Sequence, residues 1–220
     1  DYYAAVNKPS GLFVHRSNFD RNAPYVLGKL RNMLGRYVYP VHRLDRPTSG
    51  VVLFGLTSGA AGRLSALFRT KEIIKHYVAL VRGFTDKEGT IDYPVKNENG
   101  VKKQAITHYR TRSYYEIAIP VGRYNSGRYS LVDITPETGR RHQIRKHMAH
   151  IHHPIIEDTV YGDGRHNRLF RERFDMHRLL LHAASLRFIH PYTQVPVEIE
   201  ANPDQTLFDF FDGLESMYKV

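Results

Sequence analysis

Residues 41–50 read VHRLDRPTSG and lie between two apolar runs, each of which predicts a strand. The stretch places Asp45 between Arg43 and Arg46, directly before a Pro-Thr-Ser-Gly turn. Two neighbouring guanidinium groups favour the ionised form of a carboxyl group, and a connection between strands displays it at the edge of a sheet. Asp45 is therefore a candidate nucleophile or base. The alternative is an ordinary turn, in which the Asp45 side chain caps backbone N–H groups and both arginines are solvated.

The amino-acid composition indicates a folded, basic protein. The chain has 220 residues, of which 41% are hydrophobic and 12% aromatic, enough to bury a substantial core. Lys and Arg number 32 against 22 Asp and Glu, and the formal charge of +10 indicates a polyanionic partner, with nucleic acid favoured over an anionic membrane. The sequence contains no cysteine, which excludes disulfides and thiolate metal sites within it and permits a reducing cytoplasm.

The sequence carries no targeting or membrane pattern. No apolar run approaches the roughly 20 residues that span a bilayer, and the first residues lack the basic-then-apolar order of a signal peptide. We therefore expect a cytoplasmic protein without a membrane partner. Because the sequence begins at Asp1 and not at a methionine, we also expect that a few native residues precede it.

Periodicity and turn residues predict more strands than helices. Strands are expected at residues 2–6, 12–15, 37–41, 51–56, 75–83, 105–112, 115–120, 128–135, 180–190 and 197–199. Helices are expected at residues 23–34, from Thr57 or Ser58 to about Thr70, after residue 141, and around residues 207–214. Residues 84–103 are polar and predict a hairpin excursion. The pattern indicates a single α+β domain over residues 1–220, with a mixed, largely antiparallel sheet that splits into two lobes around a cleft.

Residues 137–148 read ETGRRHQIRKHM and predict the entry and first turns of a helix. Ile144 and Met148 recur at helical spacing, so Arg145 lies in an early turn of a helix that faces the core. A buried arginine needs an anionic partner, and Asp45 is the leading candidate. The other basic residues of this stretch fit an exposed helix face: Arg140, Arg141 and Lys146.

Other catalytic chemistries find less support in the sequence. Five of the 13 histidines fall within residues 142–153, which suggests a metal site. However, no His-Glu-x-x-His pattern occurs, no acidic residue stands at ligand spacing in the predicted helix, and histidines on a basic face more often contact phosphate or solvent. The Gly-x-Ser-x-Gly elbow and the phosphate-binding P-loop pattern are absent, and no second carboxylate is paired with Asp45. A mechanism with one carboxylate remains.

Six short motifs resemble, in the same order, those of the RluA-type pseudouridine synthases. They are NKPSG at residues 7–11, HRLD and TSG within residues 42–50, KxYxA at 75–79, TGRxHQIR at 138–145, HPI at 153–155 and LLHA at 180–183. The resemblance covers almost the whole chain and is strongest to members that act on tRNA. It implies the catalytic fold of that family, with helices flanking two lobes around an RNA-binding cleft and no separate S4-type RNA-binding domain. Glu157 departs from the pattern, which has glycine there, and this concerns only the local loop.

The resemblance implies an isomerase that converts uridine to pseudouridine in RNA without a cofactor or metal ion. Asp45 matches the catalytic aspartate, whose proposed roles are attack on the ribose, attack on the base, or proton abstraction from the ribose; the sequence leaves these open. Arg145 matches the arginine that pairs with this aspartate and keeps it ionised. Tyr77 matches the active-site tyrosine that stacks on the uracil, and a core tyrosine of a strand would need the same rigid placement.

The resemblance also implies base flipping, because a base in folded tRNA cannot reach such a pocket without leaving its stack. Arg43 matches the residue that enters the vacated stack. Leu181 matches an apolar residue of the uracil pocket, with a plain core leucine as the alternative. Further RNA contacts are expected at His42, Arg46, Arg140, Arg141 and His142. The implied partner is tRNA, at the end of the T-stem beside the acceptor stem, with no obligatory protein partner.

Three alternatives stay open. The same isomerisation could act on ribosomal RNA. A non-catalytic RNA-binding module would need the basic surface but not Asp45, Arg145 and Tyr77 together. A metal-dependent nuclease that uses the histidine cluster predicts an activity that a chelator abolishes.

Overall fold

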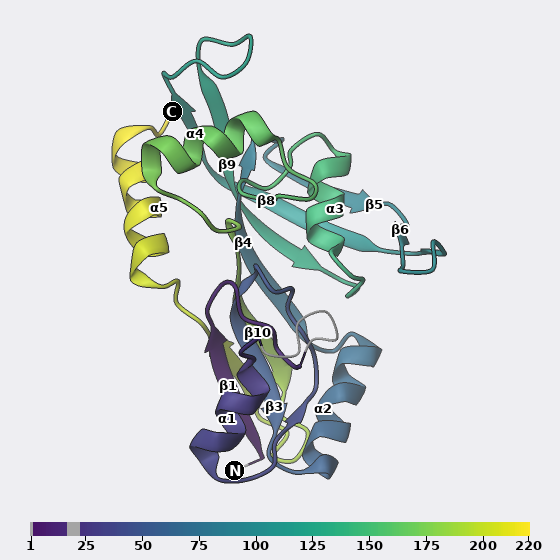
Figure 1. The fold of residues 1–220 in the computed structure, drawn as a ribbon. Helices are drawn as coiled ribbons and strands as arrows, with labels where there is room; N and C mark the ends of the chain where they lie inside the picture. Colours follow the sequence, from purple (N-terminus) through teal and green to yellow (C-terminus); the bar gives the residue numbers. More distant parts are fainter. Residues whose placement is uncertain (1, 17–22) are drawn as a thin grey trace. The chain divides into compact units, whose positions relative to one another are not determined.

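The computed structural model describes residues 2–16 and 23–220, and the chain forms two compact units (Figure 1). The first unit comprises Asp1–Lys75 and Ala183–Asn202, and the second comprises His76–His182 and Pro203–Val220. The chain passes from one unit to the other within the strands β4 (Ile74–Arg82) and β10 (Leu181–Ile189), and again between Asn202 and Pro203. In the described part of the chain, no helix is long and apolar enough to cross a membrane.

The first unit is a small sheet with two helices. Its elements are β1 (Tyr3–Lys8), α1 (Val26–Leu34), β2 (Tyr39–Pro40), β3 (Ser49–Gly55), α2 (Ser58–Thr70), most of β10, and β11 (Pro196–Glu200). β1 and β2 pair with β3, β11 pairs with β10, and all three pairings are antiparallel. Every residue of β3 is buried, and α2 packs on it closely. At Gly55 an added Cβ would lie 2.5 Å from the Ala61 nitrogen, so this position admits only glycine.

The second unit is built on a sheet with the strand order β4-β9-β8-β5, in which neighbours are antiparallel. Its other elements are β5 (Glu88–Asp92), β6 (Val95–Lys96), β7 (Lys102–Lys103), β8 (Ile106–Ile117), β9 (Gly127–Pro136), α3 (Gln143–His150), α4 (Gly164–Phe174) and α5 (Gln205–Met217). Ile144 and Met148 of α3 belong to a buried cluster with Val132 and Ile134 of β9. α4 and α5 lie side by side (Figure 1), and their rings of Phe170 and Phe210 are 5.9 Å apart.

The predicted α+β class and most predicted elements are confirmed. Thr57 caps α2, with its Oγ1 accepting a hydrogen bond from the Ala60 N–H at 3.1 Å. Gly35 ends α1 in the left-handed conformation, with φ 60°. The predicted hairpin excursion contains β6 and β7, and α3 begins where the 137–148 stretch places it.

One predicted strand is wrong, two others form a single strand, and two elements were not predicted. Residues 12–15 form no strand, because the carbonyls of Phe13 and Val14 accept hydrogen bonds from the N–H groups of Val26 and Leu27 and so pair with the start of α1. The strands expected at 105–112 and 115–120 are one strand, β8, with an irregularity between Thr111 and Ser113 in its pairing with β9. β5 and α4 are additional elements.

Asp133 cross-links three strands of the second unit. Its carboxylate accepts hydrogen bonds from His76 Nε2 on β4 and from Arg112 Nε on β8, both at 2.6 Å. Burial raises the pKa of the Asp133 carboxyl, but the bonds from His76 and Arg112 outweigh burial and lower the pKa to about 2.

The substitution Asp133→Asn is expected to lower the free energy of unfolding by about 2 kcal/mol at neutral pH. A carboxyl group whose pKa is lower in the folded than in the unfolded chain stabilises the fold above about pH 4 and loses this effect as the pH falls toward 2. About half of the difference between the two proteins should therefore remain at pH 3. Urea denaturation at a series of pH values measures it; a difference that stayed constant down to pH 3 would contradict the assignment.

Candidate active site

Asp45 lies in the connection between β2 and β3, as its sequence position predicts. Its side chain is partly buried, while those of Arg43 and Arg46 are exposed and that of Leu44 is buried. The Asp45 carbonyl accepts a hydrogen bond from the Thr48 N–H at 3.1 Å, which closes the turn that leads into β3. The loop is therefore anchored in the core by Leu44 and shaped by its own backbone.

Lys8 connects this loop to residues 9–12 through hydrogen bonds to backbone carbonyls. The residue is fully buried, and its Nζ donates to the carbonyl oxygens of Pro9, Leu12 and Arg46 at 2.9, 2.9 and 3.1 Å. The Gly11 N–H also donates to the Arg46 carbonyl, and Arg46 Nε donates to the Gly11 carbonyl. Residues 7–11, the NKPSG motif, thus hold the Asp45 loop in place through these bonds, and we call them the clamp around Lys8. The turn residues of the motif do not by themselves indicate this role.

The substitution Lys8→Met is expected to lower the free energy of unfolding by about 3 kcal/mol, because three carbonyls lose the donor that the buried Lys8 provides. The Thr48 and Gly11 amides should exchange with solvent faster, since both belong to the turn that Lys8 holds. Ser10→Ala is the control, because it removes one hydrogen bond to the Pro47 carbonyl and should cost about 1 kcal/mol. Chemical denaturation and amide exchange measure both effects; equal losses in the two variants would contradict the special role of Lys8.

His42 is held inside the first unit as a neutral ring. Its Nε2 accepts a hydrogen bond from the Leu53 N–H at 2.9 Å, and its ring stacks on Phe68 with centroids 4.4 Å apart. Burial, and then the charge of Lys75, lower the pKa of His42 to about 3. His42 therefore offers no positive charge at neutral pH, and a contact with RNA at this residue stays a prediction.

The two arginines beside Asp45 differ in their surroundings. Arg46 is bonded to Gly11, and its guanidinium lies 5.0 Å from the centre of the Phe13 ring. Arg43 is exposed, and among the described residues none forms an ion pair or a hydrogen bond with its side chain. Arg43 is thus available to a ligand, whereas Arg46 supports the loop.

Arg145 is buried on α3 and is bound by a carboxylate of its own unit. Its Nε and Nη2 donate to the two Asp158 oxygens at 2.7 and 2.8 Å, and these side chains are only 4% and 1% exposed. Asp158 Oδ1 also accepts hydrogen bonds from the N–H groups of Val160 and Tyr161. Burial raises the pKa of Asp158, but the bonds from Arg145 and from these amides outweigh it and lower the pKa. The expected need for an anionic partner is confirmed, with Asp158 as a partner that the sequence did not single out.

Helix α4 holds the segment that carries Asp158. Asn167 accepts a hydrogen bond from the Glu157 N–H at 2.9 Å and donates one to the Asp158 carbonyl at 3.0 Å. Glu157 has φ 61°, the left-handed conformation that favours the glycine expected there, and its buried carboxylate binds Arg171 at 2.8 Å. Burial, the largest effect, raises the pKa of Glu157. The unusual residue is therefore accommodated by an ion pair to α4.

Tyr77 and Leu181 lie in the second unit, as does Arg145, whereas Asp45 and Arg43 belong to the first. Tyr77 is half-buried on β4, opposite Ile134 of β9, and packs against the buried cluster that contains Leu181. Leu181 is 3% exposed. Both side chains are thus rigidly placed. A role in the hydrophobic core and a role in the uracil pocket would both require this placement.

The remaining candidates surround the start of α3. Arg140 Nε donates to the Gln104 carbonyl at 3.1 Å, Arg141 is paired with Glu98, and His142 Nδ1 lies 3.0 Å from the Tyr161 hydroxyl. The buried His147 is bonded to Thr107 Oγ1 and to the Tyr93 carbonyl. Within residues 2–16 and 23–220, no group of three or more His, Asp or Glu side chains has a geometry that could hold a metal ion.

Comparison with known proteins connects this arrangement to a family. The family model described as RNA pseudouridylate synthase matches residues 2–150. The chain is 44% identical to "tRNA pseudouridine synthase C" of Vibrio vulnificus (98% of this chain, 93% of the relative) and 46% identical to the protein of the same name of Vibrio cholerae (99% and 95%). The solved structure of "Human RNA Pseudouridylate Synthase Domain Containing 1" superposes with a TM-score of 0.74 at 25% identity, covering 99% of this chain and 84% of that one. The chain therefore belongs to the RNA pseudouridylate synthase family.

Proposed function

We propose that this protein isomerises uridine to pseudouridine in tRNA. The similarity over 98% of the chain to a relative named tRNA pseudouridine synthase C carries this proposal. In the reaction the bond between uracil N1 and ribose C1′ breaks, and a bond between uracil C5 and C1′ forms. N1 gains a proton and C5 loses one, so the reaction needs no oxidant and no cofactor. The target is a uridine at the end of the T-stem, beside the acceptor stem.

Asp45 is the residue on which the chemistry depends, as nucleophile toward ribose or base, or as the base that removes a ribose proton. The clamp around Lys8 supports this role, because a catalytic group must be held in a fixed position. Arg145 is the proposed partner of this carboxylate, and the ion pair with Asp158 orients the Arg145 guanidinium. Tyr77 stacks on the uracil, and Leu181 lines the pocket that receives it.

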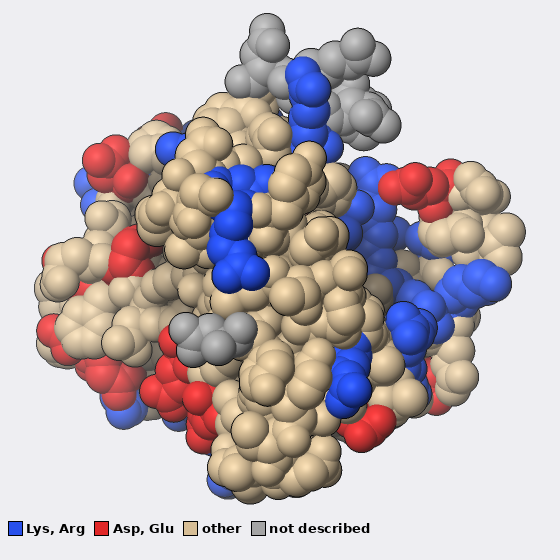
Figure 2. Space-filling model, turned by 90° about the horizontal axis from the view of Figure 1, so that it is seen from below, with Lys and Arg blue, Asp and Glu red and all other residues tan. Residues whose placement is uncertain are grey.

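The target base must leave its stack, at a cost of a few kcal/mol. Arg43 enters the vacated stack, which its exposure and its lack of an ion pair among the described residues support. His42, Arg46, Arg140, Arg141 and His142 are proposed as further RNA contacts. The basic composition supports binding to phosphates. On the face shown in Figure 2, Lys and Arg form several separate groups, and Asp and Glu lie on the same face. A tRNA substrate and the absence of cysteine support a cytoplasmic location.

Tritium release tests the proposal. tRNA transcribed with 5-tritiated uridine should lose tritium to water when the protein acts, because the C5 proton is replaced during isomerisation. Ribosomal RNA labelled in the same way should release much less. Binding without release would indicate a non-catalytic RNA-binding module, and strand cleavage that a chelator stops would indicate a metal-dependent nuclease; either result would overturn the proposal.

A further inference from the structure

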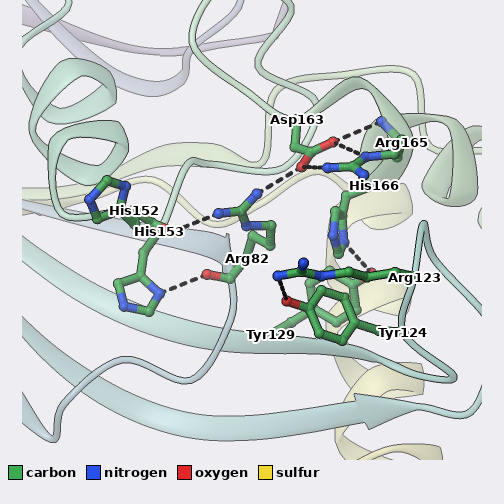
Figure 3. A network of polar contacts seen from close by, with 9 residues as sticks. All are labelled: Arg82, Arg123, Tyr124, Tyr129, His152, His153, Asp163, Arg165 and His166. Carbon is green, nitrogen blue, oxygen red and sulfur yellow. Dashed lines mark hydrogen bonds and ion pairs between the residues drawn. The ribbon is translucent and has the colours of Figure 1, made fainter.

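An exposed basic surface of the second unit lies outside all the residues discussed so far. Helix α4 presents Arg165 and Arg168 one turn apart on its exposed side, and the neighbouring loop of residues 121–124 presents Arg123. We call these three arginines the α4 surface. Figure 3 shows two of them: Arg165, which is bonded to Asp163, and Arg123, which is bonded to the Tyr124 hydroxyl.

The loop and the helix are fitted to each other. Residues Val121 and Tyr124 close the loop with two backbone hydrogen bonds, and Gly122 between them has φ 61°. A Cβ at Gly122 would lie 2.9 Å from Arg165 Nη1, so the guanidinium rests on the glycine backbone. The Arg123 guanidinium lies 5.1 Å from the centre of the Tyr124 ring and donates to its hydroxyl at 2.9 Å (Figure 3). Arg123 and Arg165 are thus placed before any ligand arrives.

Positive charge exceeds negative charge on this surface. Asp163 is shared by Arg82, at 2.7 Å, and Arg165, at 3.4 Å, although 69% of the Arg165 side chain remains exposed. In the ranges that the structure describes, no carboxylate pairs with Arg123 or Arg168. Exposed arginines whose charge is not fully neutralised fit oxyanions, and their planar guanidinium groups match phosphate in particular.

We propose that the α4 surface binds backbone phosphates of the tRNA at nucleotides other than the target uridine. The inference rests on the proposed function, which supplies a substrate much longer than the nucleotide being modified. Phosphate contacts of this kind position the RNA without reading its sequence. The α4 surface should therefore contribute to affinity, and so to KM, but not to kcat.

Salt-dependent binding tests the surface. The double variant Arg123→Gln/Arg168→Gln should bind an unmodified tRNA transcript about tenfold more weakly at low salt, and the slope of log K against log salt should fall by about 2, because each phosphate contact releases about one counterion. Arg173→Gln is the control, since Arg173 is exposed on the same helix but lies roughly 140° around its axis from Arg168.

The expected result is a lower slope and a higher KM in the double variant, with kcat and the thermal midpoint unchanged and the control like wild type. An unchanged slope would overturn the inference and leave the surface to another partner, such as an acidic protein. A loss in Arg173→Gln half as large as that of the double variant would overturn it too, because the effect would then follow the number of charges removed. If the wild-type protein binds tRNA with a steeper salt dependence than the double variant but releases no tritium, the inference would stand and the proposed function would be contradicted.

Discussion

Asp45→Asn is expected to reduce pseudouridine formation by at least about 10⁴-fold while leaving the affinity for tRNA close to that of wild type. Asparagine has nearly the same shape, so the turn with its Asp45–Thr48 backbone hydrogen bond should persist. It cannot act as a carboxylate nucleophile or base, however, and all three proposed roles of Asp45 require the ionised oxygen. Single-turnover tritium release, together with tRNA binding, separates the two effects.

Asp212→Asn is the matched control, because it makes the same substitution at an exposed carboxylate of α5. It should behave as wild type in both assays. If Asp45→Asn released tritium at the wild-type rate, Asp45 would be a turn residue and the catalytic carboxylate would have to be sought elsewhere.

Asp158→Asn is expected to lower the free energy of unfolding by about 3 kcal/mol, because it removes the two-oxygen ion pair between Asp158 and the buried Arg145 guanidinium. The amide can still accept hydrogen bonds from the Val160 and Tyr161 N–H groups, so the loss reports mainly the ion pair. Activity should fall as well, since Asp158 orients the arginine that is proposed to act on Asp45. Urea denaturation and tritium release measure the two effects.

A double-mutant cycle with Arg145→Met separates stability from catalysis. The double variant should be less destabilised than the sum of the single variants, because each single substitution already removes the ion pair that the two side chains share. Arg145→Met should impair turnover more than RNA binding. If it lost tRNA affinity with kcat intact, Arg145 would be a phosphate contact instead.

Much of the fold follows from short-range patterns in the sequence. Thr57 and Gly35 are ordinary helix boundary signals, and both lie where the structure needs them. α4 escaped prediction because its buried residues include the polar Asn167, which bonds to the Glu157–Asp158 segment, so its apolar pattern is weak. β8 was divided in two because its polar residues 110–113 interrupt the apolar alternation, although the odd-numbered residues remain the more buried ones along the whole strand.

The candidate site also contains residues that the sequence predicts and residues that only the structure reveals. Asp45, Arg145 and Tyr77 stand in motifs that the sequence displays directly. The roles of Lys8 and Asp158 become visible only in the folded chain. The neighbouring sequence does not indicate that a lysine beside a turn will be fully buried, or which of several acidic residues will pair with a given arginine. Such choices depend on tertiary packing, which residue spacing does not reveal.

Mapping pseudouridine in an unmodified tRNA treated with the purified protein tests the central claim most directly. With wild-type protein we expect pseudouridine at one position, at the end of the T-stem beside the acceptor stem, and with Asp45→Asn we expect none. Pseudouridine formed equally by both proteins, or none formed by wild type on tRNA that it binds, would contradict the account.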